Sequence, residues 1–331
     1  MLALLRSLAI RILPARWYST VRRMYGKRFP ASAMVTTESW TSRTFQRHVL
    51  RAKPTLHHFE IHVTDHCNLN CRGCAHFSNI SPPWFADPEA FRSDMQVMGR
   101  LFRVDQIYVL GGEPLLHPDL VRFLDISREV FPETRIYLLT NGLLLTKMPD
   151  EFWSALARTR SILLVDDYPT GIPVEEIKRL SAERDVTLEW TPRREEFFRL
   201  PIDLDRKHDS FESFRRCQGY NNCPIVRNGR LYPCAYIAYS DVLEQRFSIE
   251  TGDSVASSIS IHDADDAWAV MDFLLQPVPW CAHCDFGNFS FQKWGRTRRD
   301  LSEWVDIPGE IGSRDGAPAP ELGTTCAGPG C

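Results

Sequence analysis

A run of three closely spaced cysteines is the part of the sequence best suited to metal chemistry. Cys67, Cys71 and Cys74 have the spacing C-x3-C-x2-C and follow an apolar segment that we predict to be a strand. Thiolates are soft ligands that suit iron–sulfur clusters and zinc. Because a closed structural site takes four protein ligands, three thiolates leave one coordination position open, where a substrate or cofactor can bind.

The composition limits the kind of protein in which these thiols act. The chain has 331 residues, of which 44% are hydrophobic and 24% are charged, as in ordinary globular proteins of about two domains. This balance excludes a collagen-like, wholly disordered or multi-span membrane protein. The 39 basic and 42 acidic residues leave a net charge of −3, so no general electrostatic field favours nucleic acid as a partner.

The cysteine content and the N-terminal residues bear on the cellular compartment. The chain holds ten cysteines and is too long to be a small disulfide-stapled domain. The opening apolar run, Met1–Leu5, ends at Arg6 and does not resemble a secretory signal. No apolar stretch reaches the roughly 20 residues of a membrane-spanning helix. We therefore expect a cytoplasmic protein whose thiols serve metal or redox chemistry.

Alternating strands and helices are predicted to position the cysteine run. After residue 57, short apolar segments alternate with segments whose apolar residues recur at helical spacing. Repeated βα units of this kind predict an α/β fold with a parallel sheet, open or closed into a barrel, whose site lies at the carboxyl ends of the strands. The predicted strands cover residues 58–64, 106–110, 134–140, 161–165 and 186–191, and the predicted helices cover residues 87–102, 118–130, 152–159 and 173–185.

Two further motifs fall at such strand ends. Gly111-Gly112-Glu113-Pro114 follows the second predicted strand, and Thr140-Asn141-Gly142 ends the third. Glycines permit close approach of the backbone, and a carboxylate suits an ammonium group. Together with the cysteine run, in this order on βα units, these motifs resemble the radical SAM superfamily. The resemblance covers about residues 57–200 and implies a partial (β/α)6 barrel.

The resemblance implies two cofactors and an electron donor. In that superfamily three cysteines hold a [4Fe–4S] cluster, and S-adenosylmethionine binds its fourth iron. Reduction by a donor such as flavodoxin or ferredoxin cleaves S-adenosylmethionine and yields a 5′-deoxyadenosyl radical. A zinc site built from the same thiols is the alternative. The implied contacts to S-adenosylmethionine are Gly111, Gly112, Glu113, Pro114, Thr140 and Asn141.

One position departs from the superfamily pattern. The residue before the third cysteine is usually aromatic and contacts adenine, whereas here it is Gly73. We expect His76 or Phe77 to substitute for it. The adenine contact is then expected from a side chain that follows the cysteine run.

A second set of cysteines follows residue 200. Cys217, Cys234, Cys281 and Cys284 resemble the beginning of the SPASM extension of radical SAM enzymes without its later cysteines, as in the shorter twitch domain. The resemblance implies an auxiliary [4Fe–4S] cluster held by these four thiolates, a ligand set that suits electron transfer. Cys223 is the alternative to Cys217 as the first ligand, and zinc is the alternative metal.

Several other residues are candidates for the reaction itself. Cys223, if it is not a ligand, is a candidate hydrogen-atom donor, as in radical SAM epimerases; a structural thiol is the alternative. Asp166 and Asp167 end the fourth predicted strand, and Glu189 and Arg193 lie in or after the fifth. These polar residues are candidates to bind substrate or to take a proton, with turn capping and solvent exposure as the alternatives. The histidines of the first strand lack a metal-ligand pattern and are assigned to structure: His57, His58 and His62.

The chain is expected to have four parts. A basic helical extension covers residues 1–56, the radical SAM barrel 57–200, the auxiliary-cluster module 201–307, and a disordered tail with Cys326 and Cys331 covers 308–331. The first 30 residues hold seven Lys and Arg and no acidic residue. This pattern fits an interfacial helix that contacts an anionic membrane surface, an organelle-targeting peptide, or a helix packed on the domain.

These features predict a radical SAM enzyme that takes a hydrogen atom from its substrate. The twitch-type resemblance implies oxidation or epimerisation of a sugar or aminocyclitol, with the auxiliary cluster as a possible electron acceptor. Peptide modification by thioether formation, crosslinking or epimerisation is an alternative, although the residues before position 57 do not resemble a peptide-recognition domain. A non-catalytic iron–sulfur or zinc-binding scaffold is the alternative of another class.

Overall fold

The computed structural model describes most of the chain between its two terminal segments. The described residues are 43, 46–217 and 223–306. The basic segment 1–30 and the tail 308–331, with Cys326 and Cys331, lie outside the described residues. None of the helices in the described part is long and apolar enough to cross a membrane.

The chain divides into two compact units, residues 1–52 and residues 53–331. In the first unit the described backbone includes a π-helical turn, Gln46–Leu50. The second unit holds both sets of cysteines and all the strands of the described chain.

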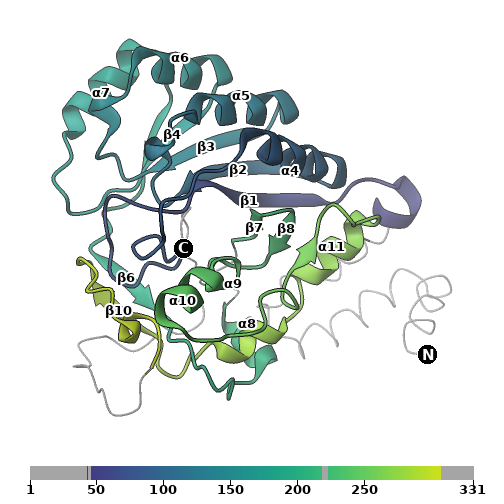
Figure 1. Ribbon diagram of the computed structural model, residues 1–331. Coiled ribbons are helices and arrows are strands. Elements are labelled where there is room, and N and C mark those ends of the chain that lie inside the picture. The colour runs from purple at the N-terminus through teal and green to yellow at the C-terminus, as the bar shows by residue number, and fades with distance from the viewer. Residues whose placement is uncertain (1–42, 44–45, 218–222, 307–331) are drawn as a thin grey trace, which may run out of the picture. The chain divides into compact units, whose positions relative to one another are not determined.

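An eight-stranded sheet forms the frame of the second unit (Figure 1), in the order β5-β4-β3-β2-β1-β7-β8-β9. Strands β1 to β5 are parallel and lie in the sheet in chain order. β7 also runs parallel to β1, and β8 and β9 continue the sheet in antiparallel pairing. The strands are β1 (Thr55–Thr64), β2 (Arg103–Gly111), β3 (Arg135–Thr140), β4 (Ile162–Val165), β5 (Leu188–Trp190), β6 (Glu196–Arg199), β7 (Ile225–Arg227), β8 (Arg230–Tyr232), β9 (Ile259–Ser260) and β10 (Ser290–Lys293).

Four helices join the parallel strands and cover one face of the sheet (Figure 1). The predicted α/β class and the parallel order of the strands are therefore confirmed. Because β1 to β5 run parallel, their carboxyl ends all lie along one edge of the sheet. The joining helices are α4 (Pro88–Leu101), α5 (Leu120–Val130), α6 (Asp150–Thr159) and α7 (Val174–Glu183); the later ones are α8 (Ser210–Cys217), α9 (Ala235–Ala238), α10 (Ser240–Phe247) and α11 (Ala267–Leu274).

The sheet departs from a six-unit βα repeat after β5. β6 pairs antiparallel with β10, outside the main sheet. The sixth parallel strand is instead β7, which pairs with β1 at the opposite edge from β5. The residues between β5 and β6, TPRRE, are polar and charged, which disfavours another buried parallel strand beside β5. Among the described residues, the consecutive βα strands therefore number five.

Helix α4 shows how the local sequence starts a helix and buries one of its faces in the core. Its N-cap residue, Asp87, accepts hydrogen bonds from two backbone N–H groups of the first turn, and Pro88 occupies the first helical position. Both features stabilise a helix start. Burial of each large apolar side chain on the inner face contributes about 1.5–3 kcal/mol. The face predicted from the periodicity is buried as expected, with Phe91, Met95 and Met98.

The segment after residue 200 packs on the other face of the sheet, where α9 and α10 lie (Figure 1). Its apolar side chains form a second core cluster that includes Trp280 and Trp304, together with Phe77 from the loop after β1. The loop of the first cysteine run is therefore held between the parallel strands and the C-terminal segment.

β1 and β2 approach each other unusually closely where both strands end. A Cβ atom on Gly111 would lie 2.2 Å from the carbonyl oxygen of Thr64, and one on Gly112 would lie 2.2 Å from that of His66. The close approach allows the Gly112 N–H to donate to Thr64 and the Glu113 N–H to donate to His66. The two glycines thus serve the meeting of two backbones at the edge where the cysteine loop begins.

Replacement of Gly111 by alanine is expected to lower the free energy of unfolding by at least about 2 kcal/mol, because two backbones must move apart. Gly295→Ala is the matched control. Nothing lies within 4 Å of a Cβ atom there and the backbone is outside the left-handed region, so its effect should stay below about 0.5 kcal/mol. Urea unfolding of the full chain measures both. Equal effects for the two variants would contradict the close-packing argument.

Candidate functional site

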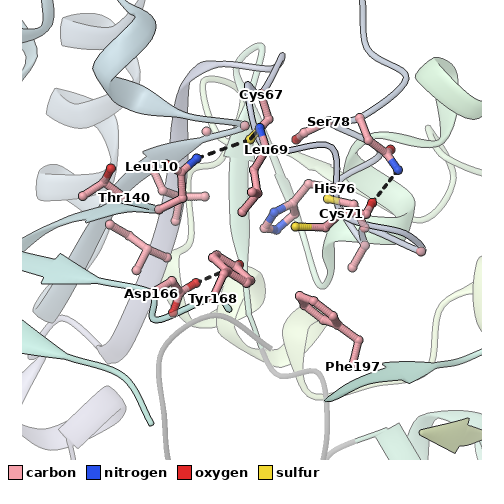
Figure 2. A pocket seen from close by; sticks show the side chains of 18 of the residues that line it. Cys67, Leu69, Cys71, His76, Ser78, Leu110, Thr140, Asp166, Tyr168 and Phe197 are labelled. Atoms are coloured by element: carbon pink, nitrogen blue, oxygen red, sulfur yellow. Dashed lines mark hydrogen bonds between the residues drawn. The ribbon is translucent and has the colours of Figure 1, made fainter. Parts of the chain in front are cut away.

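The carboxyl ends of β1 to β4 open onto a pocket (Figure 2). Its cavity volume is about 110 Å³. The structure brings most of the predicted residues together here. Those that line the pocket are Cys67, Cys71, Cys74, Gly111, Gly112, Thr140, Asn141 and Asp166.

Glu113 lies behind the residues that line the pocket and connects the ends of β2 and β3. Its carboxylate accepts hydrogen bonds from the Thr140 hydroxyl (2.6 Å), the Asn141 backbone N–H (2.9 Å) and the Leu115 backbone N–H (3.1 Å). The side chain is fully buried, and this burial raises its pKa to about 7. Glu113 and Pro114 are not among the side chains that line the pocket, so Glu113 acts in this structure by positioning Thr140 and Asn141.

The three thiols of the first run are partly buried and receive N–H donors. Burial raises the pKa of Cys67 to about 12, and it also raises the pKa values of Cys71 and Cys74. The Leu69 backbone N–H (3.4 Å) and the Asn141 side-chain amide (3.7 Å) donate to the sulfur of Cys67. Buried sulfurs with N–H donors suit an iron–sulfur cluster, since iron keeps the thiols deprotonated and N–H···S bonds tune its potential.

The C-terminal segment holds the same loop from the other side. The indole N–H of Trp294 donates to the sulfur of Cys71 at 3.3 Å, and that of Trp304 donates to the carbonyl of Cys74 at 3.0 Å. Glu303 accepts from the Gly73 N–H at 3.1 Å. No sequence motif marks these contacts, because they join residues more than 220 positions apart.

Gly73 is a glycine because of this packing. Its φ is +65°, and a Cβ atom would lie 2.6 Å from the side-chain nitrogen of Gln292 on β10. An aromatic ring has no room at this position. Of the two substitutes expected from the sequence, His76 lines the pocket, whereas Phe77 is buried in the second core cluster. The pocket also receives rings that the sequence did not single out, those of Tyr168, Phe197 and Phe198.

The two aspartates after β4 have different surroundings. Both oxygens of Asp166 accept hydrogen bonds, from Arg194 Nε at 3.0 Å and from the Tyr168 hydroxyl at 3.1 Å (Figure 2 shows the latter). Asp167 is not part of the pocket lining and lies 3.6 Å from Arg193. Glu189 is exposed on β5. Of these four candidates, Asp166 is therefore the one that the fold brings to the pocket.

The second set of cysteines gathers around Cys284. Burial first, and then the neighbouring thiols of Cys217, Cys234 and Cys281, raise the pKa of Cys284 well above its usual range. Cys223 lies elsewhere: it is buried beside Tyr108 of β2 and is not among the residues that line the pocket. The grouping of four thiols therefore includes Cys217 rather than Cys223.

A cluster makes different demands on its ligands than a single ion does. In the described part of the chain, no group of three or more His, Cys, Asp and Glu side chains surrounds one metal-ion position. Thiolates that hold a [4Fe–4S] cube each bind a separate iron, so they surround a larger volume. The three partly buried, N–H-bonded sulfurs of the first run fit that requirement.

Residues 61–193 match the model of the Radical SAM superfamily. This part of the chain is a radical SAM domain. The match begins within β1 and ends just after β5, so the radical SAM domain contains the first cysteine run, both glycine-containing strand ends and Asp166.

Curated relatives are similar in sequence to this chain over part of their length. The chain is 28% identical over 178 residues to the GTP 3′,8-cyclase of Streptomyces coelicolor, covering 52% of this chain and 44% of that protein. It is 31% identical over 113 residues to the GTP 3′,8-cyclase of Staphylococcus carnosus, covering 31% of this chain and 32% of that protein. The chain thus spans less than half of the length of these relatives.

Solved structures show a weaker likeness. BtrN in complex with AdoMet and 2-DOIA superposes with a TM-score of 0.44 and 18% identity, covering 70% of this chain and 94% of that chain. Native anSMEcpe with bound AdoMet gives a TM-score of 0.43 and 12% identity, covering 69% of this chain and 83% of that chain.

The raised pKa of Glu113 predicts a pH dependence of stability. In the unfolded chain this carboxyl titrates near 4.5, and in the folded chain near 7. Between these values the folded state keeps a proton that the unfolded state loses, so the free energy of unfolding should fall as the pH rises. At about 1.4 kcal/mol per pKa unit, the fall is about 3 kcal/mol from pH 4.5 to pH 7.

Urea unfolding of the iron-free chain and of its Glu113→Gln variant measures this dependence. The variant carries its own constant cost, but the difference between the two proteins should shrink by about 3 kcal/mol over that pH range. Two curves that stay parallel from pH 4.5 to pH 7 would show that Glu113 does not hold the extra proton.

Proposed function

We propose that this protein is a radical SAM enzyme that oxidises a hydroxyl-bearing carbon of a small polyol or aminocyclitol. The observation that carries the proposal is the pocket at the carboxyl edge of the radical SAM domain. There, three partly buried thiols line the same pocket as the glycine end of β2 and the Thr140-Asn141 end of β3. The open cluster position would lie beside these strand ends, where S-adenosylmethionine would bind.

Each group of residues has a part in this proposal. Cys67, Cys71 and Cys74 hold the first [4Fe–4S] cluster, and Asn141 and Trp294 donate N–H groups to two of the sulfurs. When bound, the cluster and S-adenosylmethionine supply a 5′-deoxyadenosyl radical that takes a hydrogen atom from the substrate. Tyr168, Phe197 and Phe198 form the wall of the pocket that orients substrate and limits water. The Tyr168 hydroxyl is held by a hydrogen bond to Asp166.

The second group of thiols supports oxidation as the outcome. Four thiols that gather around Cys284 are a full ligand set for an auxiliary [4Fe–4S] cluster, which then has no open position for substrate and serves electron transfer. Loss of a hydrogen atom leaves a substrate radical, and a carbonyl forms when that radical gives up one electron and its hydroxyl proton. Epimerisation instead needs a hydrogen donor in the pocket, and Cys223 is not among the residues that line it.

The likeness to GTP 3′,8-cyclases covers 44% and 32% of the two relatives, so it does not assign their substrate to this chain. GTP and a short peptide therefore belong in the substrate screen as competitors of the polyols. A product formed only from one of them would replace the polyol proposal.

Anaerobic reconstitution with iron and sulfide tests the proposal. Wild-type protein should hold about eight irons and, with dithionite, form 5′-deoxyadenosine from S-adenosylmethionine. A Cys281→Ala/Cys284→Ala variant should hold about four irons and keep this cleavage, because the first cluster is intact. Cys71→Ala should lose the cleavage.

Cys223→Ala is the matched control for the variants of the second set, and its iron content should equal that of wild type. About four irons in both wild type and the double variant would mean that the second set holds no cluster. Cleavage that survives Cys71→Ala would contradict the assignment of the first site.

A further inference from the structure

A cation-rich segment lies against the loop that carries the first cysteine run. Residues 293–299 begin at the last residue of β10 and have the sequence KWGRTRR. Two backbone hydrogen bonds join this segment to the cysteine loop: the Arg72 N–H donates to the Gly295 carbonyl at 2.8 Å, and the Thr297 N–H donates to the Asn70 carbonyl at 2.9 Å. The positions of its charges are therefore fixed relative to the cysteines.

The cations of this segment are exposed and unpaired within the described part of the chain. Each of the four is exposed, and none makes an ion pair with a described carboxylate. A fifth cation, Arg72, comes from the cysteine loop and is half-buried. Its Nη2 donates to the Lys293 carbonyl at 3.3 Å, and its Nε has no hydrogen-bond partner among the described residues. We call these five residues the basic loop surface: Arg72, Lys293, Arg296, Arg298 and Arg299.

The carboxylates near the basic loop surface balance its charge only in part. Asp300 is exposed at the end of the segment, and Glu196 lies opposite the last residue of β10 in the β6–β10 pair. Glu195, whose carbonyl accepts from the backbone of the segment, is 3.7 Å from Arg193 instead. Glu303 is buried and accepts hydrogen bonds from the backbone. The exposed face therefore has an excess of positive charge.

The basic loop surface is close to a cluster ligand but lies outside the pocket. Arg296 forms an antiparallel β-bridge with Cys71, and the half-buried Trp294 donates its indole N–H to the Cys71 sulfur at 3.3 Å. Residues 293–299 are not among those that line the pocket. A substrate in the pocket therefore does not account for these cations, whereas a partner on the outside of the loop would lie one side chain away from the Cys71 sulfur.

The composition of the surface indicates what kind of partner it fits. Four of its five cations are arginine, which is enriched at protein interfaces, whereas lysine is depleted there. An excess of one charge steers a partner of the opposite charge to the surface and fixes its orientation. Redox proteins meet through small interfaces, so a patch of this size is sufficient. An acidic protein that carries an electron thus matches both the charge and the place.

We propose that the basic loop surface is the docking site of an acidic one-electron donor protein. Carboxylates of the donor pair with the exposed arginines, and Trp294 lies between the donor and the Cys71 sulfur. In this step the donor loses one electron and the first cluster gains it, and no covalent bond forms or breaks. The inference rests on the proposed function and names the partner that supplies the electron for S-adenosylmethionine cleavage.

Two acidic donor proteins, a plant-type [2Fe–2S] ferredoxin and a flavodoxin, test the surface on the reconstituted full-length protein. Calorimetry measures binding of the oxidised donor, and anaerobic stopped-flow spectroscopy measures oxidation of the reduced donor. At least one donor should bind wild type at low salt. Raising the salt from about 50 to about 300 mM should weaken binding and slow the transfer at least about tenfold, because salt screens attraction between exposed charges.

A charge-reversal pair and a matched control locate the effect. Arg296→Glu/Arg298→Glu should weaken binding of the donor at least about tenfold at low salt; Arg299 stays unchanged because it bonds to the cysteine loop. Arg100→Glu/Arg103→Glu makes the same change in charge at two exposed arginines at the amino end of β2, and should bind the donor as wild type does. If the reversal variant does not fold, Arg296→Gln/Arg298→Gln takes its place, and the salt dependence of wild type remains decisive.

Three results would overturn the docking site: neither donor binds wild type at low salt, binding does not depend on salt, or the reversal variant binds the donor as tightly as the control does. Vesicles of phosphatidylglycerol and phosphatidylcholine that bind wild type but not the reversal variant, with donor binding unaffected, would assign the cations to a membrane. Dithionite-driven cleavage on the same samples keeps the two proposals apart. No 5′-deoxyadenosine from wild type, with donor binding that depends on the surface, would reject the proposed function and leave the docking site standing.

Discussion

The contact between the backbones of β1 and β2 at their carboxyl ends is the constraint on which the site depends. Gly111 and Gly112 leave no side chain between the strands, so the Gly112 and Glu113 N–H groups reach the carbonyls of Thr64 and His66. This contact fixes where the chain leaves β1 and therefore where the loop with the first cysteines begins. Glu113 extends the constraint to β3 by bonding Thr140 and the Asn141 backbone.

The C-terminal segment completes the site that the parallel strands begin. Trp294, Glu303 and Trp304 hold the loop that carries Cys71 to Cys74. The same segment follows directly on Cys281 and Cys284. The two groups of thiols are therefore joined by a short stretch of chain with direct hydrogen bonds to the first loop. Such a connection gives the second group of thiols a defined position relative to the pocket.

The sequence predicted the elements whose signals are local. Periodicity and turn chemistry are enough to predict the helix over residues 87–102, the five parallel strands and the order of the motifs at the strand ends. The same reasoning missed contacts between distant residues. The residues near Gly73 in the sequence do not predict its contact with Gln292. Similarly, the antiparallel pairing of β6 with β10, which places Phe197 and Phe198 in the pocket, was not predicted.

The polar residues of β1 show a signal that local reasoning left unused. Glu60 stands between the apolar Phe59 and Ile61 in the buried second half of β1, and His62 follows at the spacing that shares its face. The sequence assigned His62 to structure because no metal-ligand pattern surrounds it. Only the fold shows that Tyr239 stacks on His62 and that His76, which lines the pocket, meets its ring edge-on.

The central claim is that the first cluster has three protein ligands and one iron open to S-adenosylmethionine. The most direct measurement is the electron paramagnetic resonance spectrum of the reduced Cys281→Ala/Cys284→Ala protein, with and without S-adenosylmethionine. The account predicts that the signal of the remaining cluster changes on addition, because S-adenosylmethionine would bind its open iron. An unchanged signal from a cluster of about four irons would contradict the account.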